Sequence, residues 1–220
     1  MDNTSILSDK QKLFLKTFFQ EKNLSSRFYL TGGTALTEFY IPYRYSEDLD
    51  FFSETDFELL PIITFLKSNK SVFGHNTIDI NTSYNRNIIH LIFPEETLKT
   101  EFTYFPFTRI EKVKKMKSTD VDSIIDIAVN KLFTIYQNPR SRDYVDLYMI
   151  SQKYGFLMSD LLKKAKVKFD WHIDPVKLGS QFLKSKAVKD YPRLIEKVDP
   201  AIWQGFFLSE AKKLEINIFK

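Results

Sequence analysis

The 220-residue chain contains no cysteine, and this absence excludes several classes of protein. Without thiols it cannot be a disulfide-stapled scaffold, hold a cysteine-ligated zinc or iron–sulfur site, or use a cysteine nucleophile. Its three histidines, His75, His90 and His172, are too scattered for the usual histidine-rich zinc motifs. The sequence also lacks the G-x-x-x-x-G-K-[ST] pattern, which excludes a P-loop ATPase.

Long apolar runs are absent as well. No stretch of about 18 consecutive apolar residues occurs, and the N-terminal sequence MDNTSILSDKQK has no basic stretch followed by an apolar core. We therefore expect a cytoplasmic protein with no membrane partner. Hydrophobic residues make up 43% and charged residues 27% of the chain, an ordinary globular composition that excludes a disordered protein.

Charge is unevenly distributed along the chain, although the net charge is only +4. Residues 1–150 carry 18 Lys and Arg against 20 Asp and Glu, whereas residues 151–220 carry 14 against 8. A lysine-rich stretch at residues 112–117 adds a basic segment before the second part. Two interpretations stay open: solvated lysines on surface helices, or a contact with nucleic acid.

Hydrophobic periodicity predicts mixed α/β structure in the first part of the chain. The capping-box pattern S-x-x-Q at residues 8–11 predicts a helix that continues to about Gln20. Strand formers precede the pair Gly32-Gly33, and a helix is expected after it until Pro42. Further strands are expected at residues 48–52, 77–82, 88–93 and 98–105, with a helix at residues 57–66.

After Lys117 the periodicity changes to that of helices, the first of them capped by Thr119. Further helices are expected over residues 141–153 and 159–167, and after Asp174 and Asp199. The predicted fold is therefore α+β. A mixed β-sheet flanked by helices occupies residues 1–117, and an all-helical part occupies residues 118–220.

Two short motifs carry groups suited to phosphate chemistry. Asp48 and Asp50 are two residues apart on a predicted strand, so both carboxylates point to the same face. Such carboxylates repel each other unless a cation lies between them, and oxygen ligands suit Mg²⁺ or Mn²⁺. The pair Gly32-Gly33 lies at a strand-to-helix junction, where backbone N–H groups can approach a phosphate. Each motif alone also fits a solvated acid pair or a plain turn, but together they indicate a metal-assisted phosphate site.

The order of the motifs resembles that of a known family. The string GGTAL at residues 32–36 and the pattern R-x-S-x-D-L-D-F from Arg44 resemble the nucleotidyltransferase superfamily of DNA polymerase β. Within it they resemble the AbiEii-type toxins of bacterial type IV toxin–antitoxin and abortive-infection systems. Two later stretches match further motifs of that family, D-x-x-x-x-K at residues 126–131 and R-D-x-x-D-L at residues 142–147. Four matches in the right order are more specific than any one of them.

The resemblance implies a nucleotidyltransferase-like fold and transfer of a nucleoside monophosphate from an NTP to a hydroxyl. It implies that Asp48 and Asp50 hold two Mg²⁺ or Mn²⁺ ions, and that Glu101, in the last predicted strand, completes the metal site. The other expected catalytic or nucleotide-binding residues are Gly32, Gly33, Thr34, Arg44, Ser46, Lys131, Asp143 and Asp146.

Within the helical part, Lys131 is expected to reach the triphosphate, and Asp146 to orient Lys131 or the nucleobase. Simpler roles stay open for both: a solvated lysine at a helix end, and a surface ion pair of Asp143 or Asp146 with a nearby arginine. Asp126 lies on a different face of its helix from Lys131, so we expect it either to have a structural role or to support the site residues indirectly.

The resemblance also implies partners. These are an NTP, an RNA acceptor such as the 3′ end of tRNA, and a cognate antitoxin protein. Two other functions stay open: a transferase that modifies a small molecule, as antibiotic-modifying relatives do, and a catalytically inactive nucleotide- or RNA-binding module. A steep loss of RNA affinity with rising salt would favour the RNA acceptor.

Overall fold

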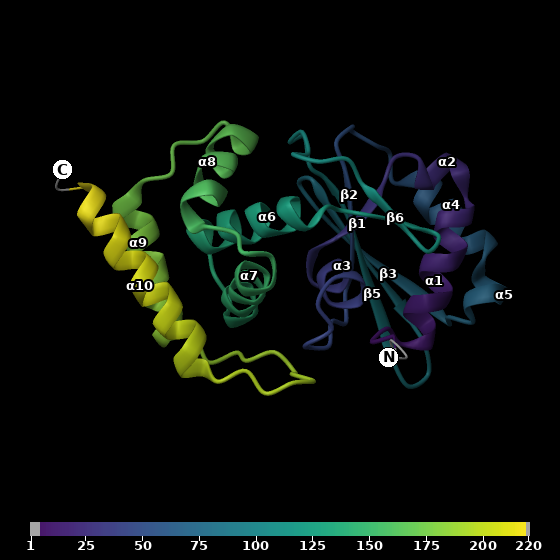
Figure 1. Cartoon of the computed structure of the whole chain (residues 1–220). Coiled ribbons are helices and arrows are strands. Elements are labelled where there is room, and N and C mark those ends of the chain that lie inside the picture. Colours follow the sequence, from purple (N-terminus) through teal and green to yellow (C-terminus); the bar gives the residue numbers. More distant parts are fainter. Residues whose placement is uncertain (1–4, 219–220) are drawn as a thin grey trace. The chain divides into compact units, whose positions relative to one another are not determined.

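The computed structural model describes residues 5–218, with side chains through residue 214 (Figure 1). Contacts divide the chain into two compact units. The first continues through Thr108 and includes Lys112–Ser123, and the second comprises Arg109–Glu111 and the chain from Ile124 onward. The boundary after Lys117 that the sequence suggests for two domains stays a prediction.

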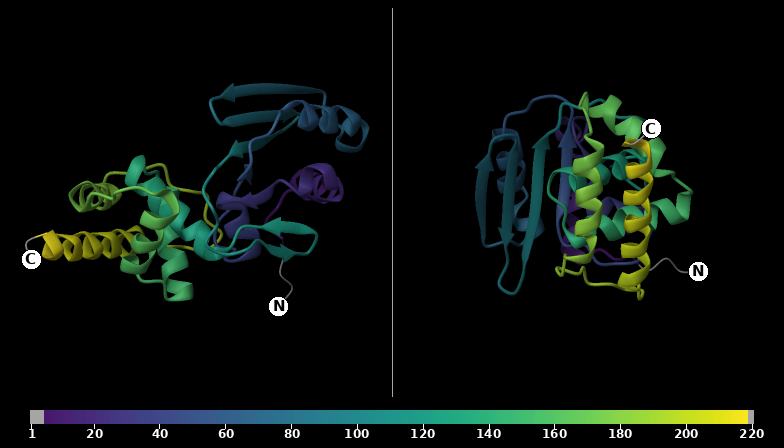
Figure 2. Two further views of the ribbon diagram at one scale, coloured as in Figure 1. Left: turned by 90° about the horizontal axis from the view of Figure 1, so that it is seen from above. Right: turned by 90° about the vertical axis from the view of Figure 1, so that its left-hand side faces the viewer.

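The first unit is built on a mixed sheet of seven strands within the described residues. The strands are β1 (Tyr29–Thr31), β2 (Leu49–Ser53), β3 (Thr77–Ser83), β4 (Arg86–Ile92), β5 (Thr97–Tyr104), β6 (Lys114–Met116) and β7 (Thr119–Val121). Their order across the sheet is β3-β4-β5-β2-β1-β7-β6, with β2/β5 and β1/β7 parallel and the other pairs antiparallel. The hairpins β3–β4 and β6–β7 form its two edges (Figure 2).

Five helices accompany the described strands of this unit: α1 (Asp9–Gln20), α2 (Lys22–Ser25), α3 (Gly32–Phe39), α4 (Leu60–Ser68) and α5 (Lys70–Phe73). The predicted capping box is confirmed: the Ser8 hydroxyl accepts from the Gln11 N–H, and the Gln11 side chain accepts from the Ser8 N–H. The helix predicted from residue 57 begins at Leu60, one residue before Pro61, which fits a first helical turn.

An aromatic cluster joins α1, α4 and α5 to one face of the sheet. The Phe18 ring lies 4.7 Å from that of Phe51 in β2 and 5.6 Å from that of Phe102 in β5, between ring centroids. Leu49, Phe51 and Ser53 are buried, whereas Asp50 and Phe52 are only partly buried. Because side chains alternate along a strand, Asp50 points away from this cluster, to the opposite face of the sheet.

The second unit is helical. Its helices are α6 (Ile124–Gln137), α7 (Ser141–Tyr154), α8 (Met158–Phe169), α9 (Pro175–Leu183), the short 3₁₀ helix η1 (Lys184–Lys186) and α10 (Pro200–Ile218). Tyr144, Phe182, Trp203 and Phe207 are buried in its core. The α+β fold class, with a helical C-terminal part, is confirmed.

One prediction at the junction is wrong. Thr119 does not cap a helix, because Thr119–Val121 forms β7, and α6 begins only at Ile124. A three-residue strand has too little periodicity to be recognised, and its pairing of Val121 with Leu30 of β1 joins residues far apart in the sequence. Within the described part of the chain, no helix combines the length and apolar character that crossing a membrane requires.

Candidate active site

Asp50 and Glu101 lie side by side on the two parallel strands β2 and β5. The strand register pairs the Cα of Asp50 with that of Glu101. Directly paired residues of neighbouring strands point to the same face of a sheet, so both acids lie on the face away from the aromatic cluster. Asp48 lies immediately before β2 and two residues from Asp50. The strand pairing therefore places the three predicted metal-binding acids within one small region.

Basic side chains neutralise two of these acids. The Lys99 ammonium lies 2.7 Å from Asp48 Oδ2. Arg86 donates two hydrogen bonds to Glu101, from Nε to Oε1 at 2.7 Å and from Nη2 to Oε2 at 2.6 Å. Thr103 adds a third hydrogen bond to Glu101 at 3.0 Å. Such charge-assisted, bidentate hydrogen bonds are stronger than neutral ones and fix the orientation of the carboxylate.

The environment of Glu101 keeps it ionised. Burial raises the pKa of Glu101, but the Arg86 hydrogen bond and charge outweigh burial and hold the pKa below its ordinary value. The same pair raises the pKa of Arg86, to which Asp50 also contributes through its charge. Glu101 is therefore a carboxylate at neutral pH, as a metal ligand must be.

The acids fit a divalent cation only in part. Oxygen atoms of Asp48 and Asp50 are suitable ligands for Mg²⁺ or Mn²⁺. Among the described residues, however, no three Asp, Glu, His or Cys side chains are grouped so as to hold a metal. Both oxygens of Glu101 accept hydrogen bonds from Arg86, so binding through Glu101 would require Arg86 to release it. Lys99 contacts Asp48 at Oδ2, whereas Arg86 engages both oxygens of Glu101, so Asp48 and Asp50 fit a metal better than Glu101 does.

Gly32 lies directly against Asp50. A Cβ atom on Gly32 would come within 2.3 Å of Asp50 Oδ2, and the backbone φ of Gly32 is +72°. Any other residue would therefore displace the carboxylate and also strain the backbone. Glycine at this position brings the start of α3 and the acid of β2 into contact.

Gly33 permits a second close approach. A Cβ atom there would lie 2.6 Å from Arg44 Nη2 and 2.9 Å from Ser46 Oγ. Helix α3 begins without a side-chain cap, since the hydroxyl of its N-cap residue Thr31 donates to Asp122 instead. A helix N-terminus flanked by a guanidinium and a hydroxyl is a suitable environment for a phosphate. The structure therefore brings Gly33, Arg44 and Ser46 together, and their binding of a phosphate stays a prediction.

Thr34 has a different contact from the one predicted. Its hydroxyl donates to the backbone carbonyl of Asp48, and the side chain is fully buried. In this conformation Thr34 fixes the residue that carries the first acid, rather than offering its hydroxyl to solvent. Its expected contact with a phosphate stays a prediction.

Lys131, Asp143 and Asp146 belong to the second unit, where they form a buried charge cluster. The Lys131 ammonium lies 2.8 Å from Asp143 Oδ1 and 2.6 Å from Asp146 Oδ2, and the two aspartate side chains are 1% and 0% exposed. Arg140 also pairs with Asp143. The alternative of a surface ion pair with an arginine is wrong about exposure, because both aspartates are buried, but Asp143 does pair with Arg140. Lys131 pairs with Asp146, but whether Asp146 orients this lysine or the nucleobase for catalysis stays a prediction.

Asp126 has the structural role that was expected. It accepts hydrogen bonds from the Lys168 ammonium at 2.7 Å and from the N–H groups of Ile110 and Glu111 at 2.9 and 3.0 Å. Burial raises the pKa of Asp126, but the charge and hydrogen bond of Lys168 outweigh it and lower the pKa. The aspartate thereby holds Arg109–Glu111 to the helical unit.

The close approach of Gly32 to Asp50 predicts that Gly32→Ala impairs activity more than stability. We expect transfer activity to fall at least about 10-fold because the new methyl group displaces the carboxylate by an appreciable fraction of an ångström. The strained backbone should cost about 1–2 kcal/mol of unfolding free energy.

Gly74→Ala is the matched control, because Gly74 has φ +75° but nothing within 4 Å of its added Cβ. It shares the strain and should retain activity. Initial rates and chemical denaturation of both variants measure the difference. Equal activity losses in the two variants would contradict the assigned contact.

Comparison with known proteins agrees with this geometry. A crystal structure described as that of a candidate nucleotidyltransferase from H. pylori is 27% identical to this chain. The match covers 95% of this chain and 98% of the other, with a TM-score of 0.60. The crystal structure of JHP933 from Helicobacter pylori is 26% identical and covers 97% of each chain, with a TM-score of 0.58. An uncharacterized protein of Aquifex aeolicus (strain VF5) is 30% identical over 149 residues.

The Aquifex match covers 64% of this chain and 66% of the relative, so it spans just under two thirds of that protein. The family model described as "Nucleotidyl transferase AbiEii toxin, Type IV TA system" matches residues 13–208. This range includes both the acids of the sheet and the charge cluster of the helical unit. The chain therefore belongs to the AbiEii family of nucleotidyltransferase toxins of type IV toxin–antitoxin systems.

Proposed function

We propose that this nucleotidyltransferase moves a nucleoside monophosphate from an NTP to a hydroxyl group of RNA and acts as a toxin. The observation that carries the proposal is the contact between Asp50 and Gly32, which joins an acid pair to a helix N-terminus suited to phosphate. Phosphoryl transfer needs positioning and charge neutralisation more than covalent participation by the protein, and this arrangement supplies both.

Asp48 and Asp50 would hold the metal, with Glu101 as a third ligand if Arg86 releases it. Bound Mg²⁺ or Mn²⁺ would neutralise charge on the attacking and leaving oxygens. The start of α3, with Gly32 and Gly33, would bind the β and γ phosphates through its N–H groups.

Two basic groups would add to the binding of the triphosphate. Arg44 is buried against Gly33 with Ser46 beside it, so its guanidinium is held ready for a phosphate oxygen. Lys131 is the proposed second group, with Asp143 and Asp146 holding its ammonium. Asp143 would act on the nucleotide only through this lysine.

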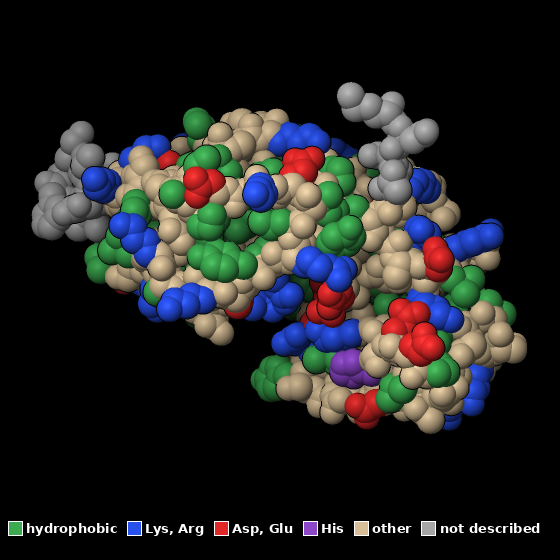
Figure 3. All heavy atoms as spheres, turned by 90° about the horizontal axis from the view of Figure 1, so that it is seen from below, with side chains coloured by type: hydrophobic (Ala, Val, Ile, Leu, Met, Phe, Trp, Pro, Cys, Tyr) green, Lys and Arg blue, Asp and Glu red, His purple; other side chains and the backbone are tan. Residues whose placement is uncertain are grey.

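RNA is the proposed acceptor because of the distribution of charge. Residues 151–220 carry 14 basic against 8 acidic residues, and lysines attract a phosphate backbone without reading bases. On the face drawn in Figure 3, basic side chains lie among acidic ones rather than forming one continuous surface. We therefore expect binding of moderate strength that weakens steeply between low and moderate salt.

The test is to incubate the purified chain with each labelled NTP, Mg²⁺ and total RNA, and to repeat it with Asp48→Ala. We expect one NTP to label RNA with the wild type and no label above background with the variant. Label retained by the variant would overturn the site. Label found only on small molecules would favour a small-molecule transferase, and binding without transfer would favour an inactive module.

The same pair of proteins tests the toxin role. Expression of the wild type in a bacterial host should arrest growth, and expression of Asp48→Ala should not. Coexpression of the neighbouring antitoxin gene should restore growth. Arrest by the variant would separate toxicity from transfer and contradict the proposal.

A further inference from the structure

The backbone that leads into Asp48 is held from α1 by a residue that the family motifs do not include. Gln11 is 4% exposed. Its side-chain Nε2 donates to the carbonyls of Ser46, at 3.1 Å, and Glu47, at 3.0 Å. Its Oε1 accepts from the Ser8 N–H at 2.9 Å, so all of the polar atoms of this side chain are used.

A third consecutive carbonyl of this segment is also held. The Thr34 hydroxyl donates to the Asp48 carbonyl, so residues 46–48 have each carbonyl fixed by a side chain. The donors come from two helices, α1 and α3. These three hydrogen bonds fix the backbone of the loop at and just before Asp48.

Helix α1 is itself a rigid support for Gln11. Positions 11, 14 and 18 lie on one helical face, and the Phe14 and Phe18 rings pack on Phe51 of β2 at centroid distances of 5.9 and 4.7 Å. The side-chain amide is therefore fixed relative to the strand that carries Asp50.

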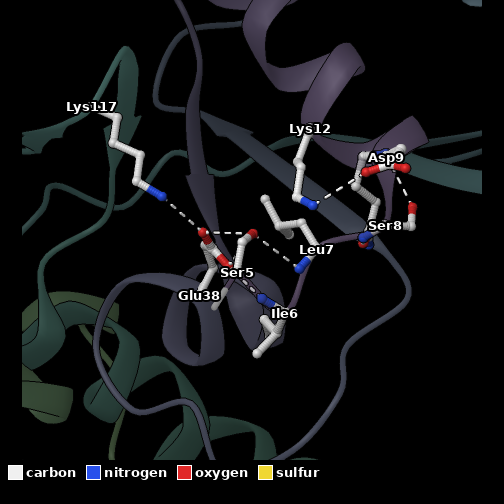
Figure 4. A network of polar contacts seen from close by, with 9 residues as sticks. Ser5, Ile6, Leu7, Ser8, Asp9, Lys12, Glu38 and Lys117 are labelled. Atoms are coloured by element: carbon white, nitrogen blue, oxygen red, sulfur yellow. Dashed lines mark hydrogen bonds and ion pairs between the residues drawn. The ribbon is translucent and has the colours of Figure 1, made fainter. Parts of the chain in front are cut away.

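The segment before α1 is anchored as well. Glu38, near the end of α3, accepts from the Ser5 hydroxyl, from the Ile6 N–H at 3.0 Å and from Lys117, and its side chain is only 3% exposed (Figure 4). Helix α3 thus contacts the Asp48 carbonyl near its start through Thr34 and the N-terminal segment near its end through Glu38. Both supports of the loop, Gln11 and Thr34, belong to one connected set of contacts.

We propose that Gln11 is a positioning residue, which sets the location of Asp48 and Ser46 for metal and phosphate binding. The proposal rests on the proposed function, because the location of Asp48 matters to activity only if Asp48 binds the metal. Displacement of a catalytic group by about 1 Å lowers rates by about 100-fold, so hydrogen bonds remote from the chemistry can carry large effects. Loss of two donors beside the loop should therefore reduce turnover.

The capping box permits a sharp test, because Glu serves as well as Gln at the third residue of the helix, the position of Gln11. Gln11→Glu keeps the acceptor for the Ser8 N–H but loses both donors to the loop. Gln11→Met loses them without adding a buried charge. Ser8→Ala, the matched control, removes the hydroxyl that caps α1 and leaves the Gln11 side chain in place.

Two measurements separate loop positioning from activity. Hydrogen–deuterium exchange of a peptide covering residues 44–50 should be at least about 10-fold faster in both Gln11 variants than in wild type, and unchanged in Ser8→Ala. The kcat for nucleotide transfer should fall at least about 10-fold in both Gln11 variants, with a smaller change in KM for the NTP. Ser8→Ala should transfer within two-fold of wild type, although its Tm falls by about 2–4 °C.

Each outcome decides one of the two proposals. Unchanged exchange in both Gln11 variants would overturn the positioning role. Faster exchange with full activity would overturn its importance for catalysis. If the wild type transfers no nucleotide to any acceptor, the proposed function fails, whereas the exchange rates still decide whether Gln11 fixes the loop.

Discussion

Replacing Asp50 by Asn is expected to lower nucleotide transfer by about 1,000-fold while leaving the fold at least as stable as in the wild type. A metal contributes several kcal/mol of charge stabilisation in phosphoryl transfer, and each ~1.4 kcal/mol is a factor of ten in rate. An amide oxygen is a weaker ligand than a carboxylate, so most of that contribution should disappear. The variant changes charge but hardly changes shape, so the contact with Gly32 survives.

The stability should not fall, because Asp50 lies near two other acids of the sheet. The register pairs it with Glu101, and Asp48, which pairs with Lys99, lies two residues before it. Like charges at such positions repel, and removal of one relieves the repulsion. Arg86 offsets part of this effect, since its charge interacts with Asp50. A net change close to zero, or a gain, is therefore expected in chemical denaturation.

Mn²⁺ titration gives a readout that does not depend on turnover. A ligand that binds only the folded state stabilises it by about 2.7 kcal/mol at 100 times its Kd, so Mn²⁺ should raise the Tm of the wild type and not that of Asp50→Asn. Asp50→Glu is the matched control for charge, because it keeps the carboxylate but moves it by one methylene group. It should bind Mn²⁺ more weakly and remain poorly active. Full activity of Asp50→Asn, which lacks the carboxylate, would exclude Asp50 as a metal ligand.

The sequence contained enough information for the acids and glycines because their arrangement is local. Alternation along one strand places Asp48 and Asp50 on the same side, and a strand followed by Gly32-Gly33 predicts a tight turn into a helix. The capping box that starts α1 is also a four-residue pattern. None of these features needs knowledge of which strands are neighbours.

The basic residues that pair with the acids of the sheet, Arg86 and Lys99, could not be predicted because their contacts depend on strand pairing. Arg86 meets Glu101 across the β4–β5 pairing, whose register no local pattern fixes. The position of Lys99 near the acids follows more directly from the sequence, because Lys99 lies two residues before Glu101 and hence on the same face of β5. Gln11 was recognised only as part of the helix cap, because its second role involves a loop about 35 residues away.

The environment of Lys131 could not be predicted from the sequence for a different reason, which is that sequence spacing does not reveal burial. A lysine near two aspartates in an amphipathic helical region is usually an exposed ion pair of small energy. Here Asp143 and Asp146 are covered, so the same three residue types form an interior cluster. Sequence spacing indicates which residues share a helix face, but it does not reveal how completely neighbouring helices exclude water.

Lys131→Ala is accordingly expected to destabilise the protein by about 3–5 kcal/mol. Removing one partner of a buried ion pair leaves an uncompensated charge in the interior, and here it would leave two carboxylates that are 1% and 0% exposed. Arg140 would remain as a partner of Asp143, through its Nε at 3.3 Å and its backbone N–H at 3.2 Å. Urea denaturation of the wild type and the variant at neutral pH measures this loss.

The pH dependence should change sign in this variant. In the wild type burial raises the pKa of Asp143, but Lys131 outweighs burial and lowers it. An acid whose folded pKa is depressed contributes stability above its ordinary pKa of about 4, and this contribution is lost as the pH falls through the lower folded value. Without Lys131 burial dominates and raises the folded pKa, so the variant should gain stability on acidification from neutral pH toward about 5. Parallel pH profiles would contradict the assigned charge cluster.

Adding Asp143→Asn and Asp146→Asn to Lys131→Ala separates folding from catalysis. The triple variant carries no unpaired buried charge from this cluster, so most of the lost unfolding free energy should return, as for other buried ion clusters replaced together. It still lacks the ammonium proposed to bind the triphosphate. A stable but inactive triple variant would show that transfer needs the cluster itself, because instability could not explain the loss. A stable and active one would leave the cluster as a purely structural element and restrict the catalytic residues to the sheet unit.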